Sequence, residues 1–296
     1  MPASAISSSG LRQTLIDAAN PAGGWGYYRG KQSRIEPTGW ALLALHDQVP
    51  AAELASHLNF LQRLTRPDGL LHESPQYPVN FAFNALAGLT FRRLGALDAH
   101  RSVLRGLIGF AGVTVSPTPV IRQDGSLHGW PWIEGTFSWV EPTSWALLAL
   151  KSAAPDDRPA AAPMRIEEGE RVLFDRVCRS GGWNYGNSAV FNQDLRPYVP
   201  TTALALLALQ DRRNHPVVQS SLDWLHRNQT SEESGMALSL TAICLRIFGV
   251  ATDAVESRLR EQAARADFLG NLHVTATTLF ALDATRHRAD ALRVQG

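Results

Sequence analysis

The sequence predicts an all-α fold, an α/α toroid (α6/α6 barrel) in which six inner helices form a ring inside six outer helices. Three observations support this prediction. A loop-and-helix unit recurs along the 296 residues, its helices are apolar nearly all round, and amphipathic segments alternate with them. A helix that is apolar on every side needs burial on every side, whereas an amphipathic helix buries one face. Alternation of the two kinds therefore indicates six outer/inner hairpins closed into a barrel.

The repeated unit is a Gly/Trp loop followed by a helix that reads ALLAL. The stretches GGWGYYRGKQSRIEPTGWALLAL (23–45) and GWPWIEGTFSWVEPTSWALLAL (129–150) align without a gap from Trp25 and Trp130 onward. The other members are 181–209 with a longer loop, TATTLFAL (275–282) without the loop, and two weaker helices that begin at Asn80 and Ser234. These six helices are the predicted inner ring.

Six segments between them have the spacing of amphipathic helices and are the predicted outer ring. They are Gly10–Ala19, Ala52–Leu64, Ala99–Phe110, Glu167–Cys178, Val217–Arg227 and Asp253–Ala266. The Pro-rich segment 153–165 is expected to be a surface linker within a single domain that covers 1–296. The segment Val113–Ile121 is expected to be a Pro-broken loop rather than a strand.

Composition and charge argue against several classes of protein. A net charge of +1 leaves no basic footprint for nucleic acid. The sequence has no run of about 18 apolar residues, the length needed to span a membrane, and its N-terminal stretch is too polar for a signal peptide. Cys178 and Cys244 are expected to be buried thiols in a reducing compartment. We therefore expect a cytoplasmic protein, with peripheral contact to a membrane surface left open.

The Gly-Trp loops that feed T-x-W-A-L-L-A-L helices, and WLHRNQ (224–229) on an outer segment, resemble the QW repeats of squalene–hopene cyclase and other class II terpenoid cyclases. The β subunits of protein prenyltransferases carry related repeats. As a repeat pattern the resemblance covers nearly the whole chain, and it implies a toroid that binds an isoprenoid. Class II terpenoid cyclases usually have a second helical barrel, so a partner protein chain could complete the cavity here.

In that family the catalytic acid lies in a D-x-D-D-T motif at the start of an inner helix, and its middle aspartate protonates an alkene or epoxide. The chain has no D-x-D-D, but SRIEPT (33–38) and WVEPT (139–143) align with the motif. Glu36 and Glu141 thus occupy the position of the protonating aspartate. The acids that flank it are replaced by Arg or Trp on one side and by Pro on the other. A lone glutamate with a raised pKa is the weaker acid.

The same register places six residues at one mouth of the barrel, namely Glu36, Asn80, Glu141, Pro200, Ser234 and His273. Because the sixth hairpin neighbours the first in a closed ring, His273 is expected beside Glu36. A titratable pair at a cavity mouth is a candidate catalytic site. In this hypothesis Glu141 or Glu36 is the general acid or base, and His273 and Asn80 orient it or stabilise charge.

A structural explanation stays open for both glutamates. A glutamate just before Pro-Thr at a helix start can cap backbone N–H groups and interact favourably with the helix dipole. Its occurrence in the same position twice fits such a role. The alternative for His273 is an ordinary buried or surface histidine, which is the commoner role of such a residue.

The residues predicted to contact an apolar ligand are Trp25, Trp40, Phe83, Trp130, Trp132, Trp145 and Arg196. Aromatic side chains within the inner helices could face a cationic intermediate. Trp25 and Trp130 precede inner helices, where they could either stack on a ligand or staple neighbouring hairpins together. Arg196 lies in a loop, where it could hold a phosphate or be an ordinary surface charge.

No metal or cofactor is expected. The D-x-C zinc motif of the prenyltransferases is missing, as are a P-loop, G-x-G-x-x-G and G-x-S-x-G. The main hypothesis is a terpenoid-cyclase-like or prenyltransferase-like enzyme that holds an isoprenoid in a central cavity. One alternative is a scaffold that binds a lipid or peptide without catalysis. The other is an α/α-barrel carbohydrate enzyme, although Glu36 and Glu141 are expected to lie further apart than the roughly 5–10 Å that glycoside hydrolysis needs.

Overall fold

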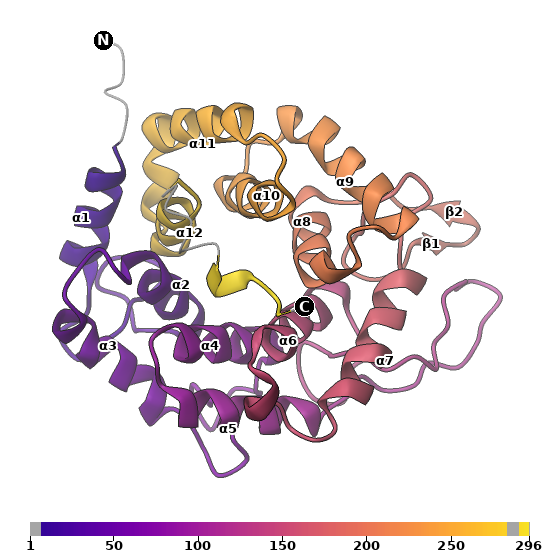
Figure 1. Ribbon diagram of the computed structural model, residues 1–296, viewed down its shortest axis with the longest axis horizontal. Coiled ribbons are helices and arrows are strands. Elements are labelled where there is room, and N and C mark those ends of the chain that lie inside the picture. Colours follow the sequence, from indigo (N-terminus) through magenta and orange to yellow (C-terminus); the bar gives the residue numbers. More distant parts are fainter. Residues whose placement is uncertain (1–6, 283–289, 296) are drawn as a thin grey trace.

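The computed structural model describes residues 7–282 and 290–295, and in these residues twelve α-helices form two concentric rings (Figure 1). The inner helices are α2 (Ile35–Leu45), α4 (Phe81–Arg93), α6 (Val140–Ser152), α8 (Val199–Ala208), α10 (Gly235–Phe248) and α12 (Leu272–Leu282). The outer helices are α1 (Ser8–Ala18), α3 (Ala51–Arg63), α5 (Leu97–Ile108), α7 (Ala162–Asp175), α9 (Pro216–Asn228) and α11 (Asp253–Ala266). Each inner helix packs against the next, and α12 packs against α2. The predicted α/α toroid is confirmed.

The helix starts differ most from expectation. Helices α2, α6 and α12 begin about one turn before the threonines that open their apolar patterns, so Glu36, Glu141 and His273 lie in first helical turns. Helix α7 begins at Ala162, inside the segment predicted as a linker. A proline in its first turn is compatible with a helix start, because that N–H has no intrahelical partner.

Short elements complete the chain between the helices. A two-stranded antiparallel hairpin, which the sequence pattern did not indicate, lies in the loop between α7 and α8 and consists of β1 (Ala189–Val190) and β2 (Gln193–Asp194). The 3₁₀ helices are η1 (Pro155–Asp157), η2 (Gln210–Arg212), η3 (Gln229–Ser231), η4 (Asp267–Gly270) and η5 (Asp290–Leu292). The segment Val113–Ile121 contains no strand, as expected, although Ile121 bridges to Val190.

The three loop tryptophans Trp25, Trp130 and Trp183 form the same clamp in three hairpins. Each is at most 1% exposed. Each indole N–H donates to a carbonyl in the last turns of the preceding outer helix, namely Leu15 (2.8 Å), Leu107 (2.8 Å) and Leu173 (2.6 Å). Each backbone N–H donates to the hydroxyl of an inner-helix threonine, namely Thr38 (2.9 Å), Thr143 (3.0 Å) and Thr202 (2.9 Å). The repeat thus encodes the junction between an outer and an inner helix.

The chain's own C-terminal segment covers one end of the barrel. Element η5 packs against α4 and α6 and lies in the middle of the ring in Figure 1. Ala291 and Leu292 are fully buried. Arg92, at the carboxyl end of α4, donates to the Ala291 carbonyl (2.9 Å), and Gln210, in η2 just after α8, donates to the Leu292 carbonyl (2.8 Å). The opposite end of the barrel carries the amino ends of the inner helices.

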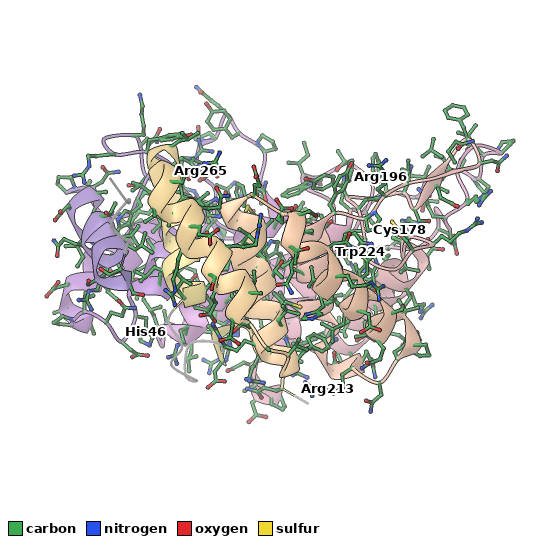
Figure 2. The ribbon with its side chains drawn as sticks, turned by 90° about the horizontal axis from the view of Figure 1, so that it is seen from above. His46, Cys178, Arg196, Arg213, Trp224 and Arg265 are labelled. Atoms are coloured by element: carbon green, nitrogen blue, oxygen red, sulfur yellow. The ribbon has the colours of Figure 1, made fainter. Side chains whose placement is uncertain are left out.

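All loops that lead from an outer to an inner helix lie at that opposite end, which we call the mouth face. Figure 2 shows the ring from its side, with Arg196 and Arg265 toward the mouth face and His46 and Arg213 toward the other. The six mouth-face loops span 19–34, 64–80, 109–139, 176–198, 229–234 and 267–271. Any ligand that meets the first turns of the inner helices has to approach through these loops.

Candidate functional site

Glu36 and Glu141 lie one turn above a pair of tryptophans that contact each other. Trp40 and Trp145 follow them by four residues on α2 and α6, and the centroids of these two rings are 5.8 Å apart. Residues four apart share one side of a helix, so both carboxyl groups lie on the mouth side of the same aromatic cluster. Trp40 also contacts Phe280, at 5.6 Å between centroids. Because Trp40 and Trp145 are 0% and 4% exposed, side chains fill the barrel at this level.

Other groups cap the two helices that carry the glutamates. The first N–H of α2, from Ile35, donates to the Glu73 carboxylate (2.7 Å), and the first N–H of α6, from Val140, donates to the Tyr185 carbonyl (2.9 Å). Within the described residues neither Glu36 nor Glu141 accepts a hydrogen bond from a backbone N–H. The capping explanation is therefore wrong for both, although their charge at a helix start stays favourable.

Glu141 is a part-buried carboxylic acid with a perturbed pKa. The pKa of Glu141 is raised to about 7. Burial is the largest cause and the Glu36 charge is the second, whereas a hydrogen bond with the Trp145 side chain lowers the pKa. A carboxyl group with a pKa near the working pH is protonated in a large fraction of the molecules, so it can act as a general acid. The structure thus gives the two glutamates different environments.

Glu36 lies in a cluster with a tyrosine and a histidine. The Tyr27 hydroxyl donates to Glu36 Oε2 (2.6 Å), and His273 Nδ1 lies 3.6 Å from the same oxygen. Burial and the Glu36 charge raise the pKa of Tyr27, so its phenol stays protonated and keeps donating. His273 is 5% exposed, and its Nε2 atom has no hydrogen-bond partner among the described residues. Closure of the ring brings His273 and Glu36 together.

Sequence reasoning missed Tyr27 and Tyr185, although the aligned repeats contain the signal. An aromatic residue follows each loop tryptophan by two positions, as Tyr27, Trp132 and Tyr185. The carbonyl of each accepts the first N–H of the neighbouring inner helix, from Leu272 (2.8 Å), Phe81 (3.1 Å) and Val140 (2.9 Å) respectively. The loop of one hairpin therefore places an aromatic ring above the helix start of another.

The other three mouth positions serve helix starts. The Asn80 side chain caps α4 by accepting from the Phe83 N–H (3.0 Å), and the Ser234 hydroxyl caps α10 by accepting from the Ala237 N–H (3.3 Å). Pro200 lies in the first turn of α8. In the described part of the chain, no hydrogen bond joins Asn80 to either glutamate.

The residues predicted to contact a ligand range from the buried core of the barrel to its exposed surface. Trp25 and Trp130 are enclosed in the clamps, and Trp40 and Trp145 lie in the barrel core. Phe83 and Trp132 are part-buried and pack against that core. Arg196 is exposed and lines a groove of about 520 Å³ on the mouth face.

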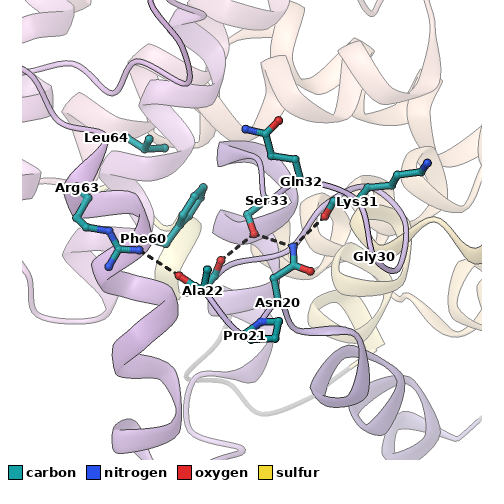
Figure 3. Close-up of a pocket in the computed structure, with 11 residues that line it drawn as sticks. Asn20, Pro21, Ala22, Gly30, Lys31, Gln32, Ser33, Phe60, Arg63 and Leu64 are labelled. Atoms are coloured by element: carbon teal, nitrogen blue, oxygen red, sulfur yellow. Dashed lines mark hydrogen bonds between the residues drawn. The ribbon is translucent and has the colours of Figure 1, made fainter.

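A second hollow, of about 620 Å³, lies beside α3 at the outer rim (Figure 3). Its polar groups bond to one another: Asn20 donates to the Ser33 hydroxyl (2.8 Å), Ser33 donates to the Gly23 carbonyl (2.7 Å), and Arg63 donates to the Ala22 carbonyl (3.1 Å). These bonds hold the first mouth-face loop against α3. The hollow thus lies at the packing boundary between two hairpins, and neither Glu36 nor Glu141 lines it.

The described residues contain no group of three or more His, Cys, Asp or Glu side chains that could hold a metal ion. Within 7–282 and 290–295, none of the helices combines the length and apolarity needed to cross a bilayer. Cys178 and Cys244 are buried, and burial raises the pKa of the Cys178 thiol to about 11. Both thiols are therefore poor nucleophiles.

The coupling between the two glutamates gives a first prediction. Replacing Glu36 by Gln removes a nearby negative charge, so the pKa of Glu141 is expected to fall below about 7. It should stay above the ordinary 4.5, because burial is the larger cause of the shift. The ¹³C carboxyl shift of Glu141, followed against pH, measures this. Glu53→Gln, at an exposed glutamate on α3, is the control, and an unchanged Glu141 midpoint in Glu36→Gln would contradict the coupling.

No protein-family model matches the chain, and no curated protein matches it at a significant level. Solved structures do. An α-amylase from Clostridium perfringens superposes with a TM-score of 0.67 at 10% identity, covering 95% of this chain and 99% of that one. A variant of the type II terpene cyclase MstE from Scytonema, in complex with merosterolic acid A, gives 0.58 at 14% identity and covers 97% of each chain. A family 76 glycoside hydrolase from a bovine Bacteroides thetaiotaomicron strain gives 0.62 at 13% identity, covering 93% and 76%.

These likenesses show the α/α toroid and nothing finer, because identities of this order are shared by proteins with different chemistry.

Proposed function

We propose that the protein is an enzyme in which Glu141, in its protonated form, acts as general acid toward an apolar ligand of the isoprenoid class bound at the mouth face. The single observation that carries the proposal is the state of Glu141. It is a part-buried acid with a pKa of about 7 that caps no helix and lies one turn above the Trp40–Trp145 pair. A part-buried acid that is not used as a helix cap and is tuned to neutral pH is typical of catalysis.

The acidity of Glu141 restricts the reacting group. A carboxylic acid with a pKa of about 7 is too weak to protonate a plain alkene readily. A basic oxygen, such as that of an epoxide or an alcohol, accepts a proton from it more easily. Glu36, held by Tyr27, would then offer a negative charge to the cation that forms, and the Trp145 ring would add cation–π stabilisation.

The distribution of exposed apolar side chains supports an apolar ligand. In the described part of the chain, eleven large apolar side chains are well exposed, and nine of them lie on the mouth-face loops. Those nine are Tyr28, Tyr77, Val113, Phe137, Tyr185, Phe191, Leu195, Tyr198 and Leu269. Aromatic and apolar side chains on one face are typical of surfaces that meet lipid or a protein. Peripheral contact with a membrane surface is part of this proposal.

The first experiment is to identify what the purified protein carries. Native mass spectrometry, followed by solvent extraction, should reveal an isoprenoid lipid bound one per chain. Glu141→Gln should carry the same lipid, because a general acid is needed for turnover rather than for apolar contact. Absence of any lipid from both proteins, together with no binding of added isoprenoids, would overturn the proposal.

A second candidate function rests on the same pair of carboxyl groups. Two carboxyl groups at the mouth of an α/α barrel, one of them with a raised pKa, lie near a groove with several aromatic rings, and they would suit glycoside hydrolysis at a separation of roughly 5–10 Å. This reading predicts release of reducing sugar from oligosaccharides, lost in Glu141→Gln. The isoprenoid reading predicts none.

A further inference from the structure

The groove that Arg196 lines is built from two pairs of aromatic rings. Phe137 and Trp139 stack at 4.6 Å between centroids, with 29° between their planes. Tyr185 and Tyr198 pair at 5.2 Å and 36°. Phe137, Tyr185 and Tyr198 are each at least 40% exposed, so these rings offer open surface rather than buried packing. The groove has about 520 Å³, within the range of small-molecule sites.

The side-chain polar groups of the groove that remain free can all donate hydrogen bonds. Asn184 uses both ends of its amide inside its own loop, with the Asn187 carbonyl (2.6 Å) and the Gly186 N–H (2.9 Å). Among the described residues no partner exists for the Tyr185 and Tyr198 hydroxyls, the Trp139 indole N–H or the Arg196 guanidinium. Burial and the nearby Glu141 charge raise the pKa of Tyr185, so its phenol stays a donor.

The charges around the groove leave an excess of positive charge. Asp194 is paired with Arg179 (3.0 Å) and lies 3.8 Å from Arg122, so its carboxylate is already neutralised. Arg196 has no ion-pair partner within the described ranges. A site with unpaired donors and net positive charge favours an oxygen-rich anion, because guanidinium bonds to carboxylate or phosphate are charge-assisted.

We propose that this groove binds an amphipathic oxyanion, with its carboxylate or phosphate group on Arg196 and its apolar or planar body against the Trp139 and Tyr185 rings. The reactive end of such a ligand would lie at Glu141. Trp139 is two residues before Glu141, and the Tyr185 carbonyl accepts the N–H of Val140 (2.9 Å), so the groove adjoins the acid. The inference rests on the proposed function only for that last step; binding in the groove does not require Glu141.

The test measures binding by quenching of tryptophan fluorescence with three probes that share one chain: farnesyl diphosphate, farnesoic acid and the neutral alcohol farnesol. Both anions should bind the native protein about tenfold to a hundredfold more tightly than farnesol. Arg196→Gln should remove that difference and leave farnesol binding unchanged. Arg227→Gln, at an exposed arginine on the outer helix α9, is the matched control and should change nothing. Tyr185→Leu should weaken all three probes.

The arms of this test separate the sources of the anion and the two proposals. Preference for farnesyl diphosphate identifies a phosphate ligand, and preference for farnesoic acid identifies a carboxylate ligand. Equal binding of farnesol and both anions, or no effect of Arg196→Gln, would overturn the groove proposal whatever Glu141 does. Unchanged probe binding in Glu141→Gln is expected here, so failure of that variant to lose turnover would count only against the proposed function.

Discussion

Glutamine in place of Glu141 is expected to reduce turnover of the identified ligand by about 10²–10⁴, the contribution typical of a positioned general acid. The amide has nearly the same shape, so the loss would come from the missing proton. The assay is single-turnover conversion of the bound ligand at pH 6.5. Glu134→Gln, at an exposed glutamate in the loop that leads to α6, is the control and should keep full activity. Retention of more than a tenth of native turnover in Glu141→Gln would contradict the assigned role.

The pH dependence of the proposed activity follows from the same group. With Glu141 as general acid, turnover requires its protonated form and is expected to fall as the pH rises through about 7. Stability follows the same direction. The folded-state pKa lies above the ordinary 4.5, so the native chain holds the proton more tightly than the unfolded chain. The resulting stabilisation is fully present below about pH 4.5 and is lost as the pH rises through 7. Glu141→Gln should therefore be the more stable protein at pH 8.

Replacement of Trp183 by alanine is expected to destabilise the fold by about 3–5 kcal/mol, the range for removal of a large buried aromatic side chain. Trp183 is 0% exposed, and its indole N–H donates to the Leu173 carbonyl (2.6 Å). The substitution leaves a cavity at the junction of α7 and α8. It also removes one of the hydrogen bonds that the Leu173 carbonyl accepts, the other coming from the Arg176 N–H (3.2 Å). Equilibrium unfolding in urea measures the loss.

Trp183→Phe separates the two parts of that loss. It keeps most of the ring volume and removes the indole hydrogen bond, so it should cost about 1–3 kcal/mol, less than the alanine variant. Trp224→Ala, at a part-buried tryptophan on the outer helix α9, should also cost less than Trp183→Ala. If the free energy of unfolding of Trp183→Ala lies within about 1 kcal/mol of the native value, the tryptophan clamp does not stabilise the junction between the outer and the inner helix, and it does not explain the repeat.

The ring of helices was predictable because its signal repeats. The ALLAL helices at 41–45 and 146–150 can be buried on all sides only by neighbours of the same kind. Helix starts were less predictable, because they depend on residues that are distant in the sequence. The start of α2 at Ile35, for example, is stabilised by Glu73, which accepts the first N–H of the helix. The hairpin β1–β2 has only two residues per strand and leaves no periodic pattern to read.

The candidate site was predictable in part. Alignment on the threonines gave Glu36, Glu141 and His273, and ring closure gave the neighbourhood of Glu36 and His273. It could not show that Tyr27 donates to Glu36 or that Tyr185 caps α6, because both contacts depend on how a loop folds back onto a helix start. Nor could it decide between a helix cap and a free acid at Glu141, because that choice depends on which group accepts the Val140 N–H.

The pKa of Glu141 is the quantity on which the account of this protein depends most directly. Glutamate labelled with ¹³C at its side-chain carboxyl, with Glu141→Gln used to assign the resonance, gives that pKa by titration in the native chain. The structure predicts a midpoint near 7, against the ordinary 4.5. A midpoint near 4.5 would mean that Glu141 is an ionised carboxylate at neutral pH, and the assignment of Glu141 as general acid would be wrong.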